Sequence, residues 1–493
     1  MMGGQIQLRF FEAGMTASSR RRFLKASSAA VAAFAVSKPV SVWADAPGPV
    51  EVWATFRDRR HAKGAPLAWK LASDAASDAI VLNPAETRQE MLGFGAALTD
   101  ASCYVLSRLP GGEQLALLQE LFAPGEMALN VCRTCIGASD YSQTVYSFDE
   151  SAEPDPEMKK FSIDHDREYI LPILSAARRI NPGLFLFSSP WSPPGWMKSN
   201  GSMLGGAMRK DNFGPYAYYL MKFLAEYKAA GVPIDAITVQ NEVDTDQDGR
   251  MPACLWGQEY EMEFVKSYLG PRFRMDEVAT KIWILDHNYN LWGRAIDELS
   301  DAGVYESIDG IAWHGYGGDV SAMTRVHEAF PQKNAYWTEG GPDINAPDYQ
   351  TDWAHWAQTF NGIANNWARS ITAWNIALDE KGKPNVGPFP CGGLVTIDNA
   401  THQVTRSGQY WAFAHFSRHV RRGARVIAAN AVGDAAVNGA AGGVSAAAFR
   451  NPGGGMVVVL ANRGPQKRIQ LLLGANALDV DLEADSVQTL EWQ

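Results

Sequence analysis

Cysteine is scarce in this chain, which has five cysteines among 493 residues. The number is odd and the positions are widely spread, and both facts argue against the disulfide framework of small secreted domains. Cys132 and Cys135 have the spacing of a redox or zinc motif, but they lie within a predicted strand, with no second pair and no histidine cluster nearby. We therefore expect buried structural thiols at these two positions.

A basic surface is also lacking. The formal net charge is −10, so the chain offers no positive field for a nucleic-acid backbone. Aromatic residues make up 11% of the chain and include 16 tryptophans, a composition that favours ligands that stack, such as sugar rings. The alternative for any single tryptophan is packing in the core.

Long apolar runs are missing beyond the N-terminus. The apolar stretch 26–36 is too short to span a bilayer, and it follows the arginines Arg20, Arg21 and Arg22. Small residues suited to cleavage follow at 42–46. We predict that residues 1–45 form a twin-arginine export signal. The mature chain is then expected to be periplasmic or secreted, with no stable membrane insertion.

Glycine-rich loops that cradle dinucleotides are absent, because Gly93-Phe94-Gly95 lacks a third glycine in register. Instead, strand-like and helix-like segments alternate from Met91 onward. Eight strands are predicted, at 91–97, 130–137, 184–189, 234–240, 281–285, 308–313, 334–338 and 370–376. Helices are predicted at 113–122, 166–179, 216–230, 258–269, 294–301, 321–330, 352–369 and 408–420. Eight alternations predict a closed (β/α)₈ TIM barrel rather than an open sheet.

The segments on either side of the barrel have another character. Short alternating strands occur at 50–54 and 79–82 and again from 425 to the C-terminus, where turns such as 451–455 separate them. We predict an all-β sandwich at 424–493 that the strands of 46–88 join, with the catalytic barrel at 89–423. The sandwich clusters no acids, histidines or metal ligands, so we expect it to support the barrel.

Two of the predicted barrel strands end on an acid. The buried strand 234–240 runs into Asn241 and Glu242, and the strand 334–338 runs into Glu339. In parallel barrels the active site lies at the carboxyl ends of the strands. Glycoside cleavage needs one carboxylic acid to protonate the leaving oxygen and a second carboxylate as nucleophile or base. Glu242 and Glu339 are therefore candidates for this pair, with Asn241 placed to bind the sugar 2-hydroxyl.

Four motifs in the same order resemble glycoside hydrolase family 30, which includes glucosylceramidases, β-1,6-glucanases, β-xylosidases and β-fucosidases. They are Gly93-Phe94-Gly95-Ala96-Ala97-Leu98-Thr99-Asp100, the loop 188–201 with Pro190-Trp191-Ser192-Pro193-Pro194-Gly195-Trp196, Val239-Gln240-Asn241-Glu242, and Trp337-Thr338-Glu339. The resemblance covers nearly all of the mature chain. It implies a retaining β-glycosidase in which Glu242 is the acid/base and Glu339 the nucleophile.

The same resemblance implies further site residues. Asp140 would bind sugar hydroxyls, Arg133 would orient the site, and Trp191 and Trp374 would wall the pocket. Tyr316 would hydrogen-bond the nucleophile and His314 would line the pocket. The alternatives are a buried ion-pair partner for Arg133, a structural histidine at His314 and a core residue at Trp374.

The protonation of the two glutamates can also be anticipated. We expect the negative charge of Glu339 and partial burial to raise the pKa of Glu242, so that this side chain is protonated at rest. Glu339 should be ionised, with Tyr316 as its support.

The loop after Glu242 departs from the family, since many members have proline where this chain has Val243. Its run Asp244-x-Asp246-x-Asp248-Gly249 resembles the start of a calcium loop, but the bidentate glutamate of such loops is missing, which favours a solvated acidic loop. No metal and no cofactor are predicted, because the histidines show no paired spacing at the strand ends.

The expected substrate is a carbohydrate or glycoconjugate, a β-linked glucoside or a related glycoside, with glucosylceramide as the family's commonest example. β-1,6-Glucanase, β-xylosidase and β-fucosidase activities stay open, and so does a non-catalytic carbohydrate-binding protein. The sequence does not indicate an oligomeric state.

Overall fold

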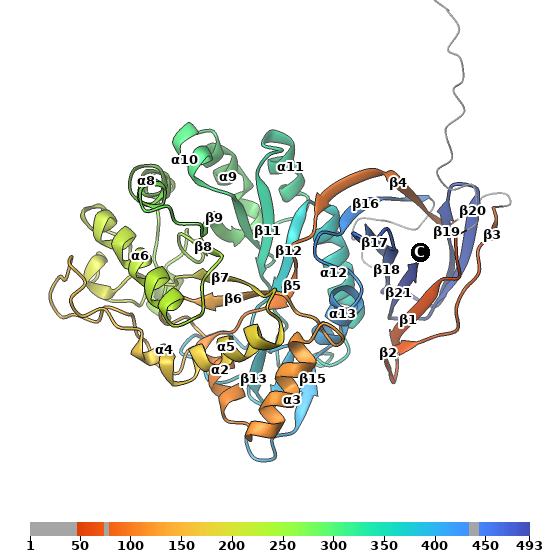
Figure 1. Ribbon diagram of the computed structural model, residues 1–493, viewed down its shortest axis with the longest axis horizontal. Coiled ribbons are helices and arrows are strands. Elements are labelled where there is room, and N and C mark those ends of the chain that lie inside the picture. The colour runs from red at the N-terminus through yellow and green to blue at the C-terminus, as the bar shows by residue number, and fades with distance from the viewer. Residues whose placement is uncertain (1–46, 73–77, 433–442) are drawn as a thin grey trace, which may run out of the picture. The chain divides into compact units, whose positions relative to one another are not determined.

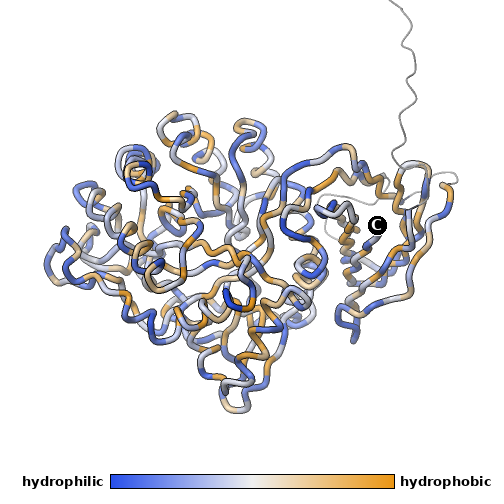
Figure 2. The backbone as a smooth tube through the Cα atoms, viewed as in Figure 1, coloured by the Kyte–Doolittle hydropathy of each residue, from blue (hydrophilic) through white to orange (hydrophobic). Residues whose placement is uncertain are grey.

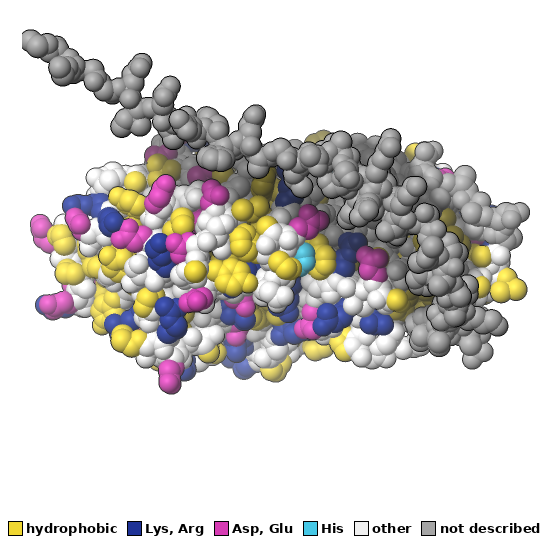
Figure 3. Space-filling view, turned by 90° about the horizontal axis from the view of Figure 1, so that it is seen from above, with side chains coloured by type: hydrophobic (Ala, Val, Ile, Leu, Met, Phe, Trp, Pro, Cys, Tyr) yellow, Lys and Arg dark blue, Asp and Glu magenta, His cyan; other side chains and the backbone are white. Residues whose placement is uncertain are grey.

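The computed structural model describes residues 47–72, 78–432 and 443–493 (Figure 1). The predicted export signal, 1–45, lies outside these residues. Among the described residues, no helix combines the length and the apolar character that crossing a bilayer requires. On the face seen in Figure 3, basic and acidic side chains are interspersed rather than gathered by sign.

Eight parallel strands form one sheet. They are β5 (Gly93–Ala96), β6 (Val131–Cys135), β7 (Phe185–Ser189), β8 (Ala236–Thr238), β9 (Lys281–Asn288), β10 (Gly310–His314), β11 (Asn334–Glu339) and β12 (Ala368–Ala373). Each strand pairs with the next along the chain, and β12 pairs with β5. The ring closes between β5 and β6, where the Leu98 amide donates to the Arg133 carbonyl over 2.7 Å. The predicted TIM barrel with an attached β-sandwich is confirmed.

A glycine permits this closure. A Cβ added at Gly95 would lie 1.8 Å from the Val131 carbonyl oxygen on the neighbouring strand, so no larger residue fits there. The Gly-Phe-Gly segment of β5 therefore serves close strand packing.

The barrel interior has two layers of different chemistry. Its lower layer is apolar and consists of Val131, Phe187, Ala236, Trp283, Ala312 and Tyr336. Two residues further along most strands comes a polar layer, made of Arg133, Ser189, Thr238, His314 and Thr338, all of them buried. Because side chains alternate along a strand, both layers point inward. The polar layer lies at the carboxyl ends, where the candidate site is expected.

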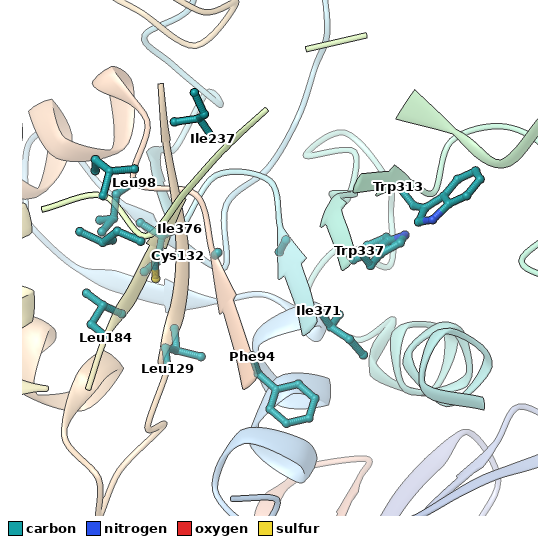
Figure 4. Close-up of a cluster of buried hydrophobic side chains, with 14 of the residues drawn as sticks. Phe94, Leu98, Leu129, Cys132, Leu184, Ile237, Trp313, Trp337, Ile371 and Ile376 are labelled. Atoms are coloured by element: carbon teal, nitrogen blue, oxygen red, sulfur yellow. The ribbon is translucent and has the colours of Figure 1, made fainter. Parts of the chain in front are cut away.

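Helices cover the outside of the barrel (Figure 1). They are α2 (Asp100–Ser107), α3 (Gly111–Phe122), α4 (Asp164–Glu168), α5 (Ile170–Ile180), α6 (Phe213–Ala229), α7 (Gln258–Phe264), α8 (Gly270–Met275), α9 (Trp292–Leu299), α10 (Ala302–Ser307), α11 (Ala322–Ala329), α12 (Trp353–Asn365) and α13 (Gly408–Ser417). Outward strand residues such as Cys132, Ile237 and Ile371 belong to the large hydrophobic cluster between strands and helices, part of which is drawn in Figure 4.

The chain between β12 and α13 forms a small sheet of its own. Its strands are β13 (Ala377–Asp379), β14 (Val395–Ile397) and β15 (Val404–Arg406). The segment between β13 and β14 includes Phe389, Pro390 and Cys391, which line the cavity described below. The long connection after the eighth barrel strand thus serves as part of the cavity rim.

Strands from both ends of the chain build the second sheet. They are β1 (Glu51–Phe56), β2 (Arg59–Lys63), β3 (Lys70–Leu71), β4 (Ala79–Glu90), β16 (Arg425–Val432), β17 (Val444–Arg450), β18 (Met456–Asn462), β19 (Lys467–Leu473), β20 (Asn476–Leu482) and β21 (Ser486–Trp492). Their order is β2-β1-β21-β18-β17-β16-β4-β19-β20-β3. The N-terminal strand β1 therefore lies beside the last strand of the chain.

The central strands of this sheet are buried on both faces. Along β18, Met456, Val458 and Leu460 enter the core of the sandwich, whereas Val457 and Val459 pack into the large barrel cluster. Double burial explains the continuous apolar sequence of this strand, and Figure 2 shows hydrophobic segments in this part of the sheet. Hydrogen bonds from α12 reach the neighbouring strand β17, including one of 3.0 Å from the Asn361 amide to Ser445.

Three histidines, which we call the junction histidines, lie where α13 meets the sandwich. They are His61, His415 and His419. His415 places its two ring nitrogens 2.8 Å from the hydroxyl oxygens of Thr55 and Thr489. The Nε2 atoms of His61 and His419 lie 2.9 Å apart. The junction is thus held by polar contacts as well as by apolar packing.

Candidate functional site

A cavity of about 460 Å³ opens at the carboxyl ends of the barrel strands. Seven of the nine predicted site residues line it: Asp140, Trp191, Asn241, Glu242, Tyr316, Glu339 and Trp374. The other two, Arg133 and His314, are fully buried beneath its floor. The expectation that His314 lines the pocket is therefore wrong; its side chain lies behind the lining and contacts Glu242, which does line the cavity.

Glu242 follows β8 and adopts an unusual backbone conformation. Its φ of +54° lies in the left-handed region, which residues other than glycine rarely occupy. The Glu242 amide donates to the Asp286 carbonyl over 3.0 Å, which holds this conformation. The side-chain amide of Gln247 donates to Glu242 Oε2 over 2.8 Å. Strain of this kind is found at functional sites, where the surrounding structure maintains it.

Glu339 is the last residue of β11 and is held from two sides. Arg133 Nη1 lies 2.5 Å from Glu339 Oε2, and the Tyr316 hydroxyl donates to Glu339 Oε1 over 3.2 Å. The residue is 6% exposed and still lines the cavity, so one edge of the carboxylate faces the space where a ligand would lie.

Asp286 is the centre of the buried network and is the main residue that the sequence did not reveal. Arg133 donates to it over 2.7 Å, and hydroxyl donors at 2.7 to 2.8 Å come from Ser189, Thr238 and Thr338. Burial disfavours its charge, but Arg133 and the other donors outweigh burial and lower the pKa of Asp286. Arg133 is thus a buried ion-pair partner and a support of Glu339 at the same time.

A bulge in β9 turns Asp286 toward the barrel axis. Leu285 and Asp286 have φ values of +70° and +45°, and the pairing with β10 shifts register between Ala312 and Trp313. Simple alternation from the inward Trp283 would point Leu285 inward; Leu285 instead packs in the outer hydrophobic cluster. A bulge re-aims side chains in this way. The signal available in the sequence was weaker: Asp286 directly follows the predicted strand 281–285.

His314 lies between three carboxylates. Its Nδ1 is 3.3 Å from Glu242 Oε1, and its Nε2 is 3.0 Å from Asp286 Oδ1 and 3.8 Å from Glu339 Oε2. Burial alone would lower the pKa of His314, but the surrounding carboxylates raise it to about 9. The imidazole is therefore charged at neutral pH, and both candidate glutamates contact the same ring.

The charged histidine changes the protonation expected for the glutamates. Burial favours the neutral form of Glu242, but His314, His287 and Gln247 together bring its pKa below the usual value. For Glu339, burial outweighs His314 and Arg133 and leaves the pKa above the usual value. The expectation of a raised pKa for Glu242 is wrong for the free site, because it did not include His314 as a cation. The ionisation of Glu339 stays a prediction.

Aromatic rings and one carboxyl with an unpartnered oxygen line the cavity together with the glutamates. Trp191 and Trp374 stack with centroids 5.0 Å apart, and the Arg133 guanidinium lies 4.6 Å from the Trp191 ring centroid. Beside them Asp140 is 4% exposed, and its Oδ1 atom has no hydrogen-bond partner. Burial is the main reason that the pKa of Asp140 is raised. An unpartnered buried oxygen at a cavity wall can accept a hydrogen bond from a ligand hydroxyl.

A second histidine approaches Glu242 from the end of β9. The Nε2 atom of His287 lies 2.6 Å from Asp244 Oδ1, and its Nδ1 lies 3.7 Å from Glu242 Oε1. Donor atoms of Glu242, His287 and His314 all lie within 4.8 Å of one another, so these three residues could hold a metal ion. Spacing along the sequence did not predict this pair of histidines, because they come from neighbouring strands.

Comparison with known proteins gives matches over nearly all of the described chain. The family model described as the glycosyl hydrolase family 30 TIM-barrel domain matches residues 91–420, and the glycosyl hydrolase family 30 beta sandwich domain matches 423–490. An endo-1,6-beta-D-glucanase of Neurospora crassa is 33% identical over 413 residues, which cover 81% of this chain and 83% of the relative.

Two further relatives widen this picture. Putative glucosylceramidase 1 of Caenorhabditis elegans is 29% identical over 405 residues, which cover 78% of this chain and 76% of the relative. The solved structure of the endo-beta1,6-glucanase BT3312 superposes with a TM-score of 0.79 at 29% identity and covers 90% of this chain and 99% of that structure.

Proposed function

Because the chain belongs to glycoside hydrolase family 30 and is an O-glycosyl hydrolase, we propose that it cleaves β-glycosides with retention, with Glu339 as nucleophile and Glu242 as acid/base. The observation that carries this assignment is the convergence of both glutamates on one cavity and on the same imidazole ring. Arg133 and Tyr316 hold Glu339 with an oxygen directed at the ligand space, as a nucleophile requires.

The reaction proceeds in two displacements. Glu339 attacks the anomeric carbon while Glu242 gives a proton to the departing oxygen, which leaves a glycosyl ester on Glu339. Glu242, now a carboxylate, takes a proton from water as the water oxygen attacks the same carbon. The ester breaks, and Glu339 leaves as a carboxylate again.

The first displacement needs a proton on Glu242, which is ionised in the free site. A sugar bound in the cavity removes water from around Glu242, and loss of water favours the neutral carboxyl. Uptake of a proton together with substrate reconciles the lowered pKa of Glu242 with its role as acid. Substrate binding is then also the event that protonates Glu242.

The remaining wall residues suit a sugar ring. The stacked Trp191 and Trp374 offer apolar surface to ring carbons, and the unpartnered Oδ1 of Asp140 can accept from a hydroxyl. Asn241 receives a hydrogen bond of 2.8 Å from Arg133 on its oxygen, which leaves its amide nitrogen to face the substrate. We assign these residues to the glycone unit.

The substrate class best supported is a β-1,6-linked glucan. The Neurospora crassa relative and BT3312 both carry that activity in their names. A second cavity of about 530 Å³ shares Tyr316, Gly341 and Pro342 with the first, which gives room for further sugar units beside the cleaved bond. Glucosylceramide is the second candidate, supported by the similarity to glucosylceramidases.

The mechanism is tested with an activated 2-fluoro glucoside and mass spectrometry of the intact protein. The wild type should gain one glycosyl mass, and digestion should place it on Glu339. Glu339→Ala should gain none, and Glu242→Gln should lose nearly all turnover of an unactivated glycoside. A label on another residue, or near-normal turnover of Glu242→Gln, contradicts the assignment; ligand binding without any turnover would favour a non-catalytic carbohydrate-binding protein.

The substrate is tested by comparing a soluble β-1,6-glucan, its β-1,3 and β-1,4 counterparts, and glucosylceramide in detergent. We expect the highest kcat/KM on the β-1,6-glucan, with oligosaccharide products. A preference for glucosylceramide would replace the glucan as the substrate and leave the mechanism unchanged.

We also propose that residues 1–45 direct twin-arginine export and are removed in the periplasm. The support is the order of the arginines Arg20, Arg21 and Arg22, the apolar stretch 26–36 and the small residues that follow. Fusion of residues 1–45 to a reporter should deliver it to the periplasm, and replacing Arg20, Arg21 and Arg22 with lysine should retain it in the cytoplasm. Equal export of both fusions would contradict the proposal.

A further inference from the structure

Three nitrogen and oxygen donors converge in the cavity without a shared partner between them. Glu242 Oε1 lies 3.3 Å from His314 Nδ1 and 3.7 Å from His287 Nδ1. The donor atoms of all three residues lie within 4.8 Å of one another. Two histidines and one glutamate with an open side form the ligand set of three-ligand zinc sites.

Both histidines are oriented by a second carboxylate. His287 Nε2 lies 2.6 Å from Asp244 Oδ1, and His314 Nε2 lies 3.0 Å from Asp286 Oδ1. In metal sites, the ring nitrogen that does not bind the metal usually donates to a carboxylate, which fixes the ring and directs the other nitrogen at the ion. Here each Nε2 has such a partner, and each Nδ1 faces Glu242.

His287 provides an independent sign of a missing ligand. Its side chain is 9% exposed, and its Nδ1 has no hydrogen-bond partner among the described residues. A buried polar atom without a partner is rare in folded proteins. This nitrogen is directed at Glu242 Oε1 from a distance too long for a hydrogen bond.

We propose that Glu242, His287 and His314 bind a divalent transition metal of the Zn²⁺ class when no sugar is present. The ion would take Glu242 Oε1 and the two Nδ1 atoms as ligands, and the Nδ1 proton of His314 would leave to solvent. Imidazole nitrogens favour Zn²⁺, Co²⁺, Ni²⁺ and Cu²⁺ over Mg²⁺ and Ca²⁺. The open side of the ion faces the cavity.

Occupation of this site stops catalysis, a consequence that rests on the proposed role of Glu242. The Glu242 oxygen bound to the ion can carry no proton to a leaving group. Because sugar and ion compete for the same carboxylate, the metal acts as a competitive inhibitor. Metal binding itself does not depend on what Glu242 does in the reaction.

The experiment uses the full mature protein, freed of metal with a chelator, and Co²⁺ and Zn²⁺ as probes. Titration with Co²⁺ should give a visible d–d absorption band that saturates at one ion per protein, and Zn²⁺ should displace it. His287→Asn should abolish the band. Asp244→Asn, on an exposed loop and outside the ligand set, should weaken binding by about 10- to 100-fold.

His327→Asn is the matched control, because His327 lies on α11 and lines no part of this cavity. It should bind Co²⁺ like the wild type. No saturable band, or a band that survives both His287→Asn and Asp244→Asn, would overturn the site. Saturable binding without inhibition of turnover would leave the site standing and contradict the role of Glu242. Loss of activity on chelation would overturn the inhibitory effect in favour of a required metal.

Discussion

The barrel mouth and the junction with the sandwich both bury histidines, but the pKa values are raised at the mouth and lowered at the junction. At the mouth, the surrounding carboxylates raise the pKa of His314 to about 9. At the junction, burial lowers the pKa of His61 to about 3, and it lowers the pKa of His415 as well. Burial is extensive in both places, so it does not decide the charge.

The partners decide it. His314 faces Asp286, Glu242 and Glu339, whereas His415 contacts the hydroxyl groups of Thr55 and Thr489 and the ring of His61. His61 meets the ring of His419, and Arg418 adds positive charge nearby. Carboxylates therefore surround His314 at the mouth, whereas hydroxyl groups, other imidazoles and Arg418 surround His61 and His415 at the junction. This contrast can be tested region by region.

The largest effect is expected from Asp286→Asn at the mouth. This change leaves Arg133 and His314 without their buried carboxylate, and breaking a buried ion pair costs about 3–5 kcal/mol. Urea unfolding should show that loss, and the pKa of His314, followed by NMR, should fall. Glu491→Gln is the control at the junction, where the contact with His419 is partly exposed and worth about 1 kcal/mol or less. Equal losses of unfolding free energy in both variants would contradict the difference between the buried network at the mouth and the contacts at the junction.

The next largest effect concerns stability against pH at the junction. The folded pKa of His61 is about 3 and its unfolded value is 6.5, so between these values the unfolded chain takes up a proton that the folded chain rejects. The contribution of His61 to the free energy of unfolding is fully present above pH 6.5. It decreases as the pH falls, by about 2 kcal/mol at pH 5. Urea unfolding of wild type and His61→Asn at pH 7 and pH 5 measures this difference. The variant should lose less; parallel losses would contradict the neutral junction.

A smaller effect should appear in the pH dependence of catalysis. Since the pKa of Glu242 is lowered and that of Glu339 is raised in the free enzyme, the acid limb of kcat/KM reports Glu242, and the acid limb of kcat reports the substrate complex. We expect the kcat limb at higher pH by about one unit, equivalent to about 1.4 kcal/mol. Limbs at the same pH would show that the sugar does not change the proton affinity of Glu242.

The smallest effect is expected from Gln247→Ala. Gln247 donates to Glu242 and so favours the carboxylate. Without it, the acid limb of kcat/KM should move up by about half a unit, the worth of a modest hydrogen bond. Gln143→Ala removes a comparable bond to Tyr169 away from the cavity and should leave the limb in place. A shift in both variants, or in neither, would contradict a direct effect on Glu242.

Much of the fold could be predicted from periodicity alone. All eight barrel strands were predicted because buried parallel strands are continuous apolar runs. The strands β13 to β15 were missed because three residues each are too few to show a period. Within the predicted sandwich, strands were expected at 425–429, 443–450, 456–461, 468–473 and 486–492, so β20 was missed. Its residues Leu478, Val480 and Leu482 nevertheless alternate as a strand requires.

The candidate site was predictable only where it follows strand ends. Glu242 and Glu339 directly follow apolar runs, and the cavity includes both. Asp286 depends on a bulge, and the pairing of His287 with Asp244 depends on two loops meeting in space. Neither the bulge nor the contact between the loops produces a periodic pattern in the sequence. The protonation of Glu242 was misjudged for the same reason, since it depends on how near His314 lies.

Strand β21 has a consequence for how the protein is made. It lies between β18 and β1, and its residue Thr489 pairs with both Val459 and Trp53. β21 is thus the strand that joins the N-terminal strand β1 to the C-terminal strands of the sandwich. Because β21 is made after both of its neighbours, β1 and β18 each have an unpaired edge during synthesis until β21 is added, and open edges of this kind can pair with other chains.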